Sequence, residues 1–145
     1  MLKVGDKAPD FSVKTHLGKT LRLSDLHGKS VILWFYPKAD TPGCTAEGCG
    51  FRDRLAKFKE KNVVVLGVSF DTEQENAKFA EKFSFPFELL CDTKREVGMA
   101  YGACKTVTDS NAKRIGYVID PKGLIKYANA SVDARTFPET VLAEV

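Results

Sequence analysis

Short, mostly apolar runs alternate along the chain with longer segments in which apolar residues recur at helical spacing. Ser30–Tyr36 and Val63–Phe70 are the two longest such runs, and runs of this kind are typical of central strands that are covered on both faces. The segment between them, Thr45–Asn62, is predicted to be a helix. Its apolar stripe consists of Phe51, Leu55 and Phe58.

A second helix is predicted directly after the second apolar run. Thr72 and Glu75 have the spacing of a capping box, in which two free amide groups at a helix N-terminus are satisfied reciprocally. A short strand over Pro86–Leu90 follows, and then a brief helix over Lys94–Tyr101 that ends at Gly102.

The last part of the chain predicts a hairpin and a final helix. Two short strands, Ile115–Ile119 and Leu124–Ala128, flank the segment Asp120–Gly123, whose Pro and Gly positions suit a type I turn. Thr136 and Glu139 form another capping box, which predicts the start of a C-terminal helix.

The order of these elements predicts the fold. Phe11–Val13 and Thr20–Leu23 flank a turn-rich tetrad and indicate an N-terminal hairpin that precedes the alternating strands and helices. Parallel crossovers in the middle and an antiparallel hairpin near the end predict a three-layer α/β/α sandwich with a mixed central sheet. This α/β order is that of a thioredoxin-like fold with an N-terminal β-hairpin extension.

Length and composition restrict the class of protein. A chain of 145 residues with 43% hydrophobic content suits one domain spanning residues 1–145. No apolar run approaches the 18 or so residues needed to cross a bilayer, so a membrane-spanning protein is excluded. The 22 basic and 19 acidic side chains are mixed along the chain, which argues against nucleic acid as the main partner, because such binding relies on concentrated basic surfaces.

The expected compartment is the cytoplasm. The start of the chain lacks the apolar core of a secretory signal. In a reducing compartment, the four cysteines are expected to be catalytic, metal-ligating or simply buried, rather than paired in structural disulfides.

The candidate chemistry lies at the first strand-to-helix junction, where Cys44 is predicted to begin a helix. Free amides and the helix dipole at that position favour negative charge, so its thiol is expected to have a lowered pKa. Because the thiolate is the attacking form of cysteine, Cys44 is a candidate nucleophile. Pro37 and Pro42 restrict the loop, and Thr41 places a hydroxyl near the sulfur. The alternative is that Cys44 is an inert, buried residue in a turn.

Cys49 follows five residues later and invites a geometric comparison with Cys44. In an intact α-helix the two Cα atoms would lie about 8.6 Å apart, beyond the roughly 7 Å within which a disulfide forms without backbone movement. A Cys44–Cys49 disulfide therefore requires at least one turn of the helix to unwind. Gly48 and Gly50 weaken the helix here. They equally allow close packing of the helix on a neighbour.

The segment Phe35–Cys49 reads FYPKADTPGCTAEGC and resembles the signature of the peroxiredoxins. Pro37, Thr41 and Cys44 match its Pro-x-x-x-Thr-x-x-Cys spacing. Within that family, part of the AhpC/TSA superfamily, the chain is most similar to the PrxQ group, also called bacterioferritin comigratory proteins. The likeness extends from Val4 to the final helix and so covers essentially the whole chain.

The resemblance implies a thiol-dependent peroxidase in which Cys44 is the peroxidatic cysteine. It would attack the O–O bond of hydrogen peroxide or an organic hydroperoxide and become a sulfenic acid. Thr41 is expected to hydrogen-bond the peroxide and the sulfur, and Pro37 to shield the thiolate. Arg114, which precedes a predicted strand, is expected to stabilise the thiolate and the charge that develops on the leaving oxygen. The remaining candidate arginines are expected to be solvated surface charges: Arg52, Arg54 and Arg135.

The resemblance also implies that Cys49 is the resolving cysteine. It would form an intramolecular disulfide with Cys44, which thioredoxin or a similar dithiol reductant would open by exchange. Neither a cofactor nor a metal is implied, and the likeness favours a monomer. Cys91 is expected to be a small buried residue, whereas for Cys104, in a predicted loop, exposure stays open. The preferred hydroperoxide and the physiological reductant stay open as well.

Two other classes of protein compete with this interpretation. A general dithiol oxidoreductase normally carries Cys-x-x-Cys, whereas four residues separate the two cysteines here; faster reduction of insulin than of peroxide would favour it. A metal-binding or structural module would show paired ligands, and Cys91 and Cys104 belong to no such pair. His16 and His27 are isolated and expected in exposed loops. Stoichiometric zinc in the reduced protein would favour this second class.

Overall fold

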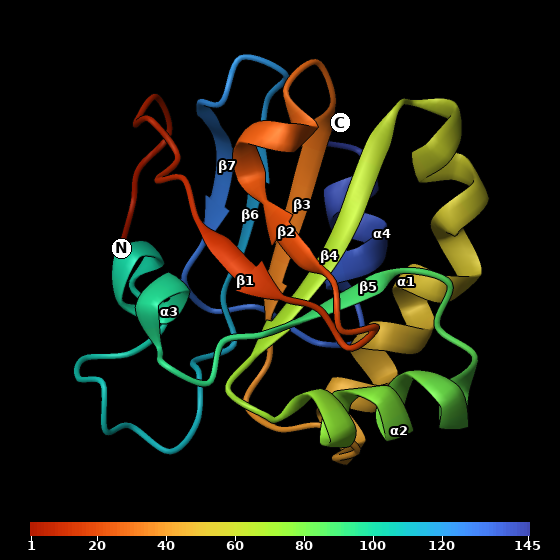
Figure 1. Cartoon of the computed structure of the whole chain (residues 1–145). Coiled ribbons are helices and arrows are strands. Elements are labelled where there is room, and N and C mark those ends of the chain that lie inside the picture. Colours follow the sequence, from red (N-terminus) through yellow and green to blue (C-terminus); the bar gives the residue numbers. More distant parts are fainter.

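The two apolar runs form the centre of a five-stranded sheet in the computed structural model, which describes all 145 residues. β3 (Ser30–Phe35) pairs in parallel with β4 (Val63–Ser69) and antiparallel with β6 (Gly116–Ile119). β5 (Glu88–Cys91) and β7 (Ile125–Asn129) lie at the edges and complete the order β5-β4-β3-β6-β7 (Figure 1). The predicted mixed sheet is confirmed.

Helices and the N-terminal hairpin form a layer on each face of this sheet (Figure 1). One face is covered by α1 (Pro42–Glu60), α2 (Glu73–Phe83) and α4 (Phe137–Leu142). The other face is covered by β1 (Ser12–Lys14), β2 (Thr20–Arg22), the 3₁₀ turn η1 (Leu23–Leu26) and α3 (Glu96–Tyr101). None of these helices is both long enough and apolar enough to cross a membrane.

Strand β3 supplies both halves of the core because its side chains alternate between the two faces. Ile32 and Trp34 pack beneath the layer of α1, α2 and α4. Val31, Leu33 and Phe35 pack beneath the hairpin and α3. All five side chains are buried, which is the physical reason why the strand is apolar at successive positions rather than at alternate ones.

Of the two predicted capping boxes, one is confirmed and one is wrong. At α2 the Glu75 amide donates to Thr72 Oγ1, and the Thr72 amide donates to Glu75 Oε1. At α4 the Thr136 side chain makes no capping hydrogen bond. The Asp133 carbonyl already accepts the Thr136 amide, and Thr136 itself adopts helical angles (φ −103°, ψ −20°), whereas a capping side chain requires an extended backbone.

The N-terminal segment covers parts of both edges of the sheet. Lys7 lies opposite Leu124 beside the start of β7, and the residues after β1 lie beside β5. There His16 Nδ1 accepts the Leu89 amide at 3.0 Å. The expected exposed loop position is therefore wrong for His16, which is half-buried. Burial lowers its pKa, which favours the neutral ring that this acceptor role requires.

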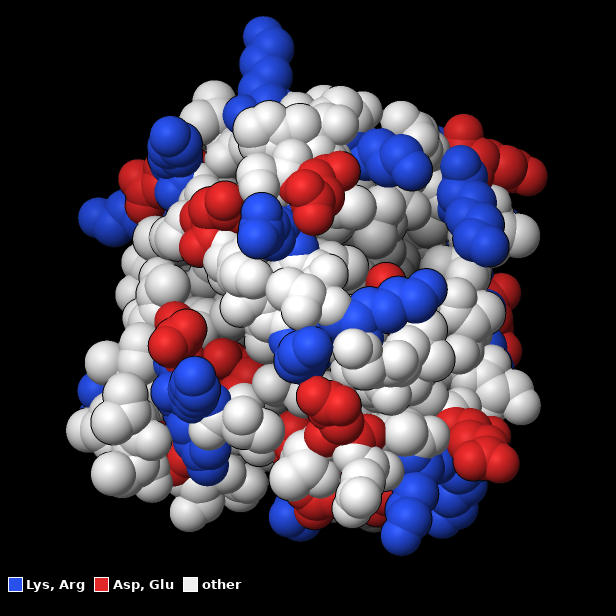
Figure 2. Space-filling view, viewed as in Figure 1, with Lys and Arg blue, Asp and Glu red and all other residues white.

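Charged side chains of both signs are interspersed on the surface. Figure 2 shows Lys and Arg next to Asp and Glu over the face that carries the N-terminal hairpin, with no broad area of one sign. This pattern agrees with the mixing of 22 basic and 19 acidic residues along the chain.

Candidate active site

Cys44 lies in the first turn of α1, shortly after the end of the central strand β3. The helix begins at Pro42 rather than at Thr45, so Cys44 is its third residue. Proline suits the first position because its ring fixes a helical φ and because it lacks the amide that would stay unpaired there. The Cys44 side chain is buried. The predicted placement of this thiol at a helix start, beside free amides and the positive end of the helix dipole, is confirmed.

Arg114 reaches Cys44 because of the antiparallel pairing of β6 with β3. The residues just before β6 lie beside the end of β3, and from there Arg114 Nη2 donates to Cys44 Sγ at 3.5 Å. Gly43 makes the approach possible, since a Cβ at that position would lie 2.8 Å from Arg114 Nη2. The structure thus brings together two of the predicted site residues that are 70 positions apart in the sequence.

Glu47 holds the other side of the guanidinium. Arg114 Nη1 donates to Glu47 Oε1 at 2.9 Å, and the Glu47 side chain is fully buried. Its second oxygen, Oε2, has no hydrogen-bond partner. Burial raises the pKa of Glu47 to about 8, although the hydrogen bond and charge of Arg114 act in the opposite direction.

Sequence reasoning did not select Glu47 as a site residue. A signal was present, because residues three positions apart lie on the same face of a helix, and Glu47 follows Cys44 at that spacing. A glutamate is nevertheless exposed in most helices. Only the position of Arg114 explains why this one is buried.

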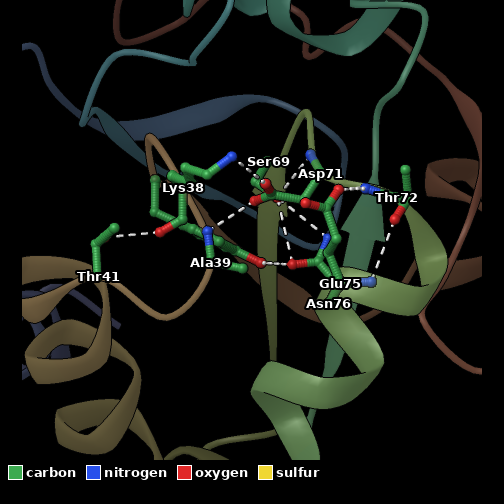
Figure 3. Close-up of polar contacts among 9 residues, drawn as sticks. Lys38, Ala39, Thr41, Ser69, Asp71, Thr72, Glu75 and Asn76 are labelled. Carbon is green, nitrogen blue, oxygen red and sulfur yellow. Dashed lines mark hydrogen bonds and ion pairs between the residues drawn. The ribbon is translucent and has the colours of Figure 1, made fainter.

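Thr41 and Pro37 lie in the loop between β3 and α1, but the expected hydrogen bond between Thr41 and the sulfur is absent. The Thr41 hydroxyl instead donates to the Lys38 carbonyl at 2.7 Å (Figure 3). A hydroxyl has a single proton to donate, so the Thr41 proton reaches the sulfur or a bound peroxide only after it leaves Lys38. Pro37 is half-buried in the same loop.

The other arginines of α1 make their contacts elsewhere. Arg52 Nη1 donates to the Phe83 carbonyl at the end of α2, and Arg54 Nη1 donates to the Gly50 carbonyl. Both side chains keep about a third of their surface exposed, which agrees with the expectation of surface charges outside the site. Arg135 is exposed as expected.

Cys49 is half-buried, and α1 is continuous from Cys44 through it. All four cysteines are free thiols. A Cβ on Gly48 would lie 2.3 Å from Phe85 Cζ, and one on Gly50 would lie 2.7 Å from Pro138 Cγ. The sequence left open whether the two glycines ease unwinding of the helix or allow close packing. In this reduced state both glycines allow close packing.

Cys91 is buried, as expected. Cys104, whose exposure the sequence left open, is buried as well. Burial raises the pKa of Cys91 to about 11 and also raises the pKa of Cys104. Cys104 belongs to the core on the α3 side of the sheet. Nowhere do three or more His, Cys, Asp or Glu side chains form a group that could hold a metal ion.

The site places a guanidinium donor and the N-terminal end of a helix beside the Cys44 sulfur. Both groups attract negative charge. When the sulfur attacks another molecule and displaces an oxygen atom, negative charge develops on that oxygen. The same preorganised donors stabilise this charge. Such an arrangement suits nucleophilic attack by Cys44 on a small electrophile.

The chain matches a known protein family and is similar to several known proteins. Residues 4–128 match the AhpC/TSA family. A putative peroxiredoxin, Bcp, of Coxiella burnetii is 43% identical over 132 residues, which cover 86% of this chain and 85% of that protein.

Solved structures of two bacterial proteins are similar over most of their length. The peroxidoxin BcpB of Mycobacterium tuberculosis is 33% identical, with a TM-score of 0.92 over 99% of this chain and 96% of that one. The bacterioferritin comigratory protein of Xanthomonas campestris, studied for its alkyl peroxide reduction activity, is 27% identical, with a TM-score of 0.86 over 92% of this chain and 88% of that one.

Proposed function

Because the chain belongs to the AhpC/TSA family and is a thiol-dependent peroxidase of the peroxiredoxin type, we propose that Cys44 is its peroxidatic residue. The observation that carries the proposal is the hydrogen bond of 3.5 Å from Arg114 Nη2 to Cys44 Sγ in the first turn of a helix. Both features attract negative charge, and the thiolate is the attacking form of cysteine. The substrates are hydrogen peroxide and organic hydroperoxides.

In the first step the Cys44 thiolate attacks the hydroxyl oxygen of the hydroperoxide. A sulfur–oxygen bond forms while the O–O bond breaks, so Cys44 is oxidised to a sulfenic acid and the peroxide is reduced to water or an alcohol. The leaving oxygen gains negative charge before it is protonated, and the Arg114 guanidinium stabilises that charge. Thr41 binds the peroxide once its hydroxyl turns away from Lys38, and Pro37 shields the sulfur.

In the second step Cys49 resolves the sulfenic acid. Its sulfur attacks the sulfur of Cys44, a disulfide forms, the S–O bond breaks, and the oxygen leaves as water with the proton of the Cys49 thiol. The first turns of α1 have to unwind, because the two Cα atoms lie too far apart in an intact helix. A thioredoxin-type dithiol then restores both thiols by exchange. A single domain, a monomeric state and a cytoplasmic location stay predictions.

Peptide mass spectrometry after one equivalent of hydrogen peroxide tests the pairing directly. The expected product is a peptide pair joined by a Cys44–Cys49 disulfide. A disulfide that joins Cys44 to Cys91, to Cys104 or to a second chain would contradict the assignment of Cys49.

We expect Cys49→Ser to limit the enzyme to one turnover. Cys44 still reacts with peroxide, but no thiol on α1 condenses with the sulfenic acid, so peroxide consumption with thioredoxin, thioredoxin reductase and NADPH should stop at about one equivalent per chain. Cys104→Ser, which replaces a buried cysteine outside the site, should keep turning over. Sustained turnover of Cys49→Ser would assign resolution to another thiol.

We expect amide exchange over Thr45–Arg52 to accelerate when the reduced protein is oxidised. Formation of the disulfide unwinds this part of α1 and separates Gly48 from Phe85, so hydrogen bonds that protect the amides in the reduced state are lost. Hydrogen–deuterium exchange of both redox states measures the change, with α2 as the internal reference. Equal protection of Thr45–Arg52 in both states would contradict the unwinding.

A further inference from the structure

One residue before Pro37 and one residue after it are held by buried polar side chains from another part of the chain. The Tyr36 hydroxyl donates to Asn76 Oδ1 at 2.7 Å. The Ala39 amide donates to Asp71 Oδ2 at 2.8 Å (Figure 3). Asn76 is fully buried, and Asp71 is 7% exposed. The active-site loop is thus fastened just before and just after Pro37.

The two fastening points are themselves joined through Ser69, the last residue of β4. Asn76 Nδ2 donates to Ser69 Oγ at 3.1 Å, and the Asp71 amide donates to the same oxygen at 3.3 Å. Hydrogen bonds therefore run without interruption from Tyr36 through Asn76, Ser69 and Asp71 to Ala39, and they enclose the part of the loop that contains Pro37.

Cys91 belongs to this network as an acceptor. Asn76 Nδ2 donates to Cys91 Sγ at 3.4 Å, so both the oxygen and the nitrogen of the Asn76 amide have partners. Burial raises the pKa of the Tyr36 hydroxyl well above its usual value, which keeps it a proton donor. The network is satisfied, as buried polar groups must be, because an unpaired buried group destabilises the folded protein.

The same loop also has an exposed ion pair, which provides a contrast. Lys82 Nζ lies 3.0 Å from Asp40 Oδ2, and both side chains are about half exposed. Exposed pairs of this kind contribute little to stability, because water screens the two charges. The buried contacts of Asp71 and Asn76 therefore dominate the position of the loop.

We propose that Asp71 and Asn76 are positioning residues for peroxide reduction, which hold Pro37 and Thr41 in place beside Cys44. Neither residue is hydrogen-bonded to Cys44, Arg114 or Glu47; both act through the loop backbone and Tyr36. The proposal rests on the proposed function, in which Pro37 and Thr41 form the peroxide pocket.

The test compares two reactions of the same sulfur in the full-length enzyme. Asp71→Ala removes the acceptor of the Ala39 amide, and a misplacement of about 1 Å can slow a reaction about 100-fold, so kcat/KM for hydrogen peroxide should fall by about 10- to 100-fold. Alkylation of Cys44 by iodoacetamide needs the thiolate but no peroxide pocket, and its rate should not change. Asp71→Asn retains an acceptor oxygen and should keep most of the peroxide rate. Lys82→Ala, the matched control, should keep all of it.

Three results would overturn the proposal: an unchanged peroxide rate in Asp71→Ala, an equal loss of both reactions, or a loss in Asp71→Asn as large as that in Asp71→Ala. If Asp71→Ala does not fold, Tyr36→Phe carries the test, because it removes only the hydroxyl that reaches Asn76. It should slow peroxide reduction without slowing alkylation, and an unchanged peroxide rate would again overturn the proposal.

Failure of the proposed function gives a different signature. If alkylation of Cys44 in the unmodified enzyme leaves peroxide reduction intact, the nucleophile is wrong, whatever the Asp71 variants do. If alkylation abolishes peroxide reduction, Cys44 is the nucleophile, and the Asp71 and Tyr36 variants then decide the positioning role alone.

Discussion

Replacing Cys44 with serine should reduce peroxide turnover to the uncatalysed background. The serine hydroxyl stays protonated at neutral pH and is a far weaker nucleophile toward oxygen than a thiolate, while its size allows α1 to begin as before. The hydrogen bond from Arg114 can be retained by the new oxygen, so the free energy of unfolding should change little. The measurement is NADPH oxidation coupled through thioredoxin reductase and thioredoxin.

The matched control for this variant is Cys104→Ser, since Cys104 is also buried but lies on the other side of the sheet. It should keep the full rate if it folds normally. Substantial peroxide reduction by Cys44→Ser, with a native circular dichroism spectrum, would move the nucleophile to another cysteine.

The second large effect is expected for Arg114→Gln. Removal of one preorganised donor to a developing oxyanion costs about 100- to 1,000-fold in rate, and Arg114 in addition stabilises the attacking thiolate. We therefore expect kcat/KM for hydrogen peroxide to fall by at least about 100-fold. Stopped-flow measurement of the first oxidation step separates this loss from any effect on recycling.

Two comparisons make the Arg114 prediction specific. Glu47→Gln retains an oxygen that can accept from Arg114 Nη1 and should lose much less activity, because the guanidinium stays near the sulfur. Arg54→Gln removes a partly buried arginine that bonds the Gly50 carbonyl, and it should leave the oxidation step unchanged. A small effect of Arg114→Gln, or an equal effect of Arg54→Gln, would contradict the assignment.

The arrangement of strands and helices could be predicted because the apolar pattern has a physical cause. Ser30–Tyr36 and Val63–Phe70 are apolar throughout because both faces of the central strands are covered. The ends of the helices were harder to predict from the sequence. The start of α1 lies at Pro42 rather than Thr45, because proline suits the first position of a helix. Thr136 does not cap α4, because its own backbone already has helical angles.

The site was predictable in part. Cys44 followed from its position at a strand-to-helix junction, whereas Arg114 followed only from the family resemblance. Glu47 was missed because its burial is matched by Arg114, which lies 67 residues further along the chain. The hydroxyl of Thr41 bonds the Lys38 carbonyl, a local choice among acceptors that sequence spacing does not decide.

The coverage of β5 and β7 by the N-terminal segment has a consequence for an enzyme whose cycle includes partial opening. Uncovered edge strands recruit strands from other molecules and lead to aggregation. His16 fills the free hydrogen-bonding position of Leu89, and Lys7 runs beside the start of β7. Neither residue lies on α1, so His16 and Lys7 keep these contacts while α1 unwinds. Oxidation and reduction of the two cysteines therefore need not uncover these parts of the sheet edges.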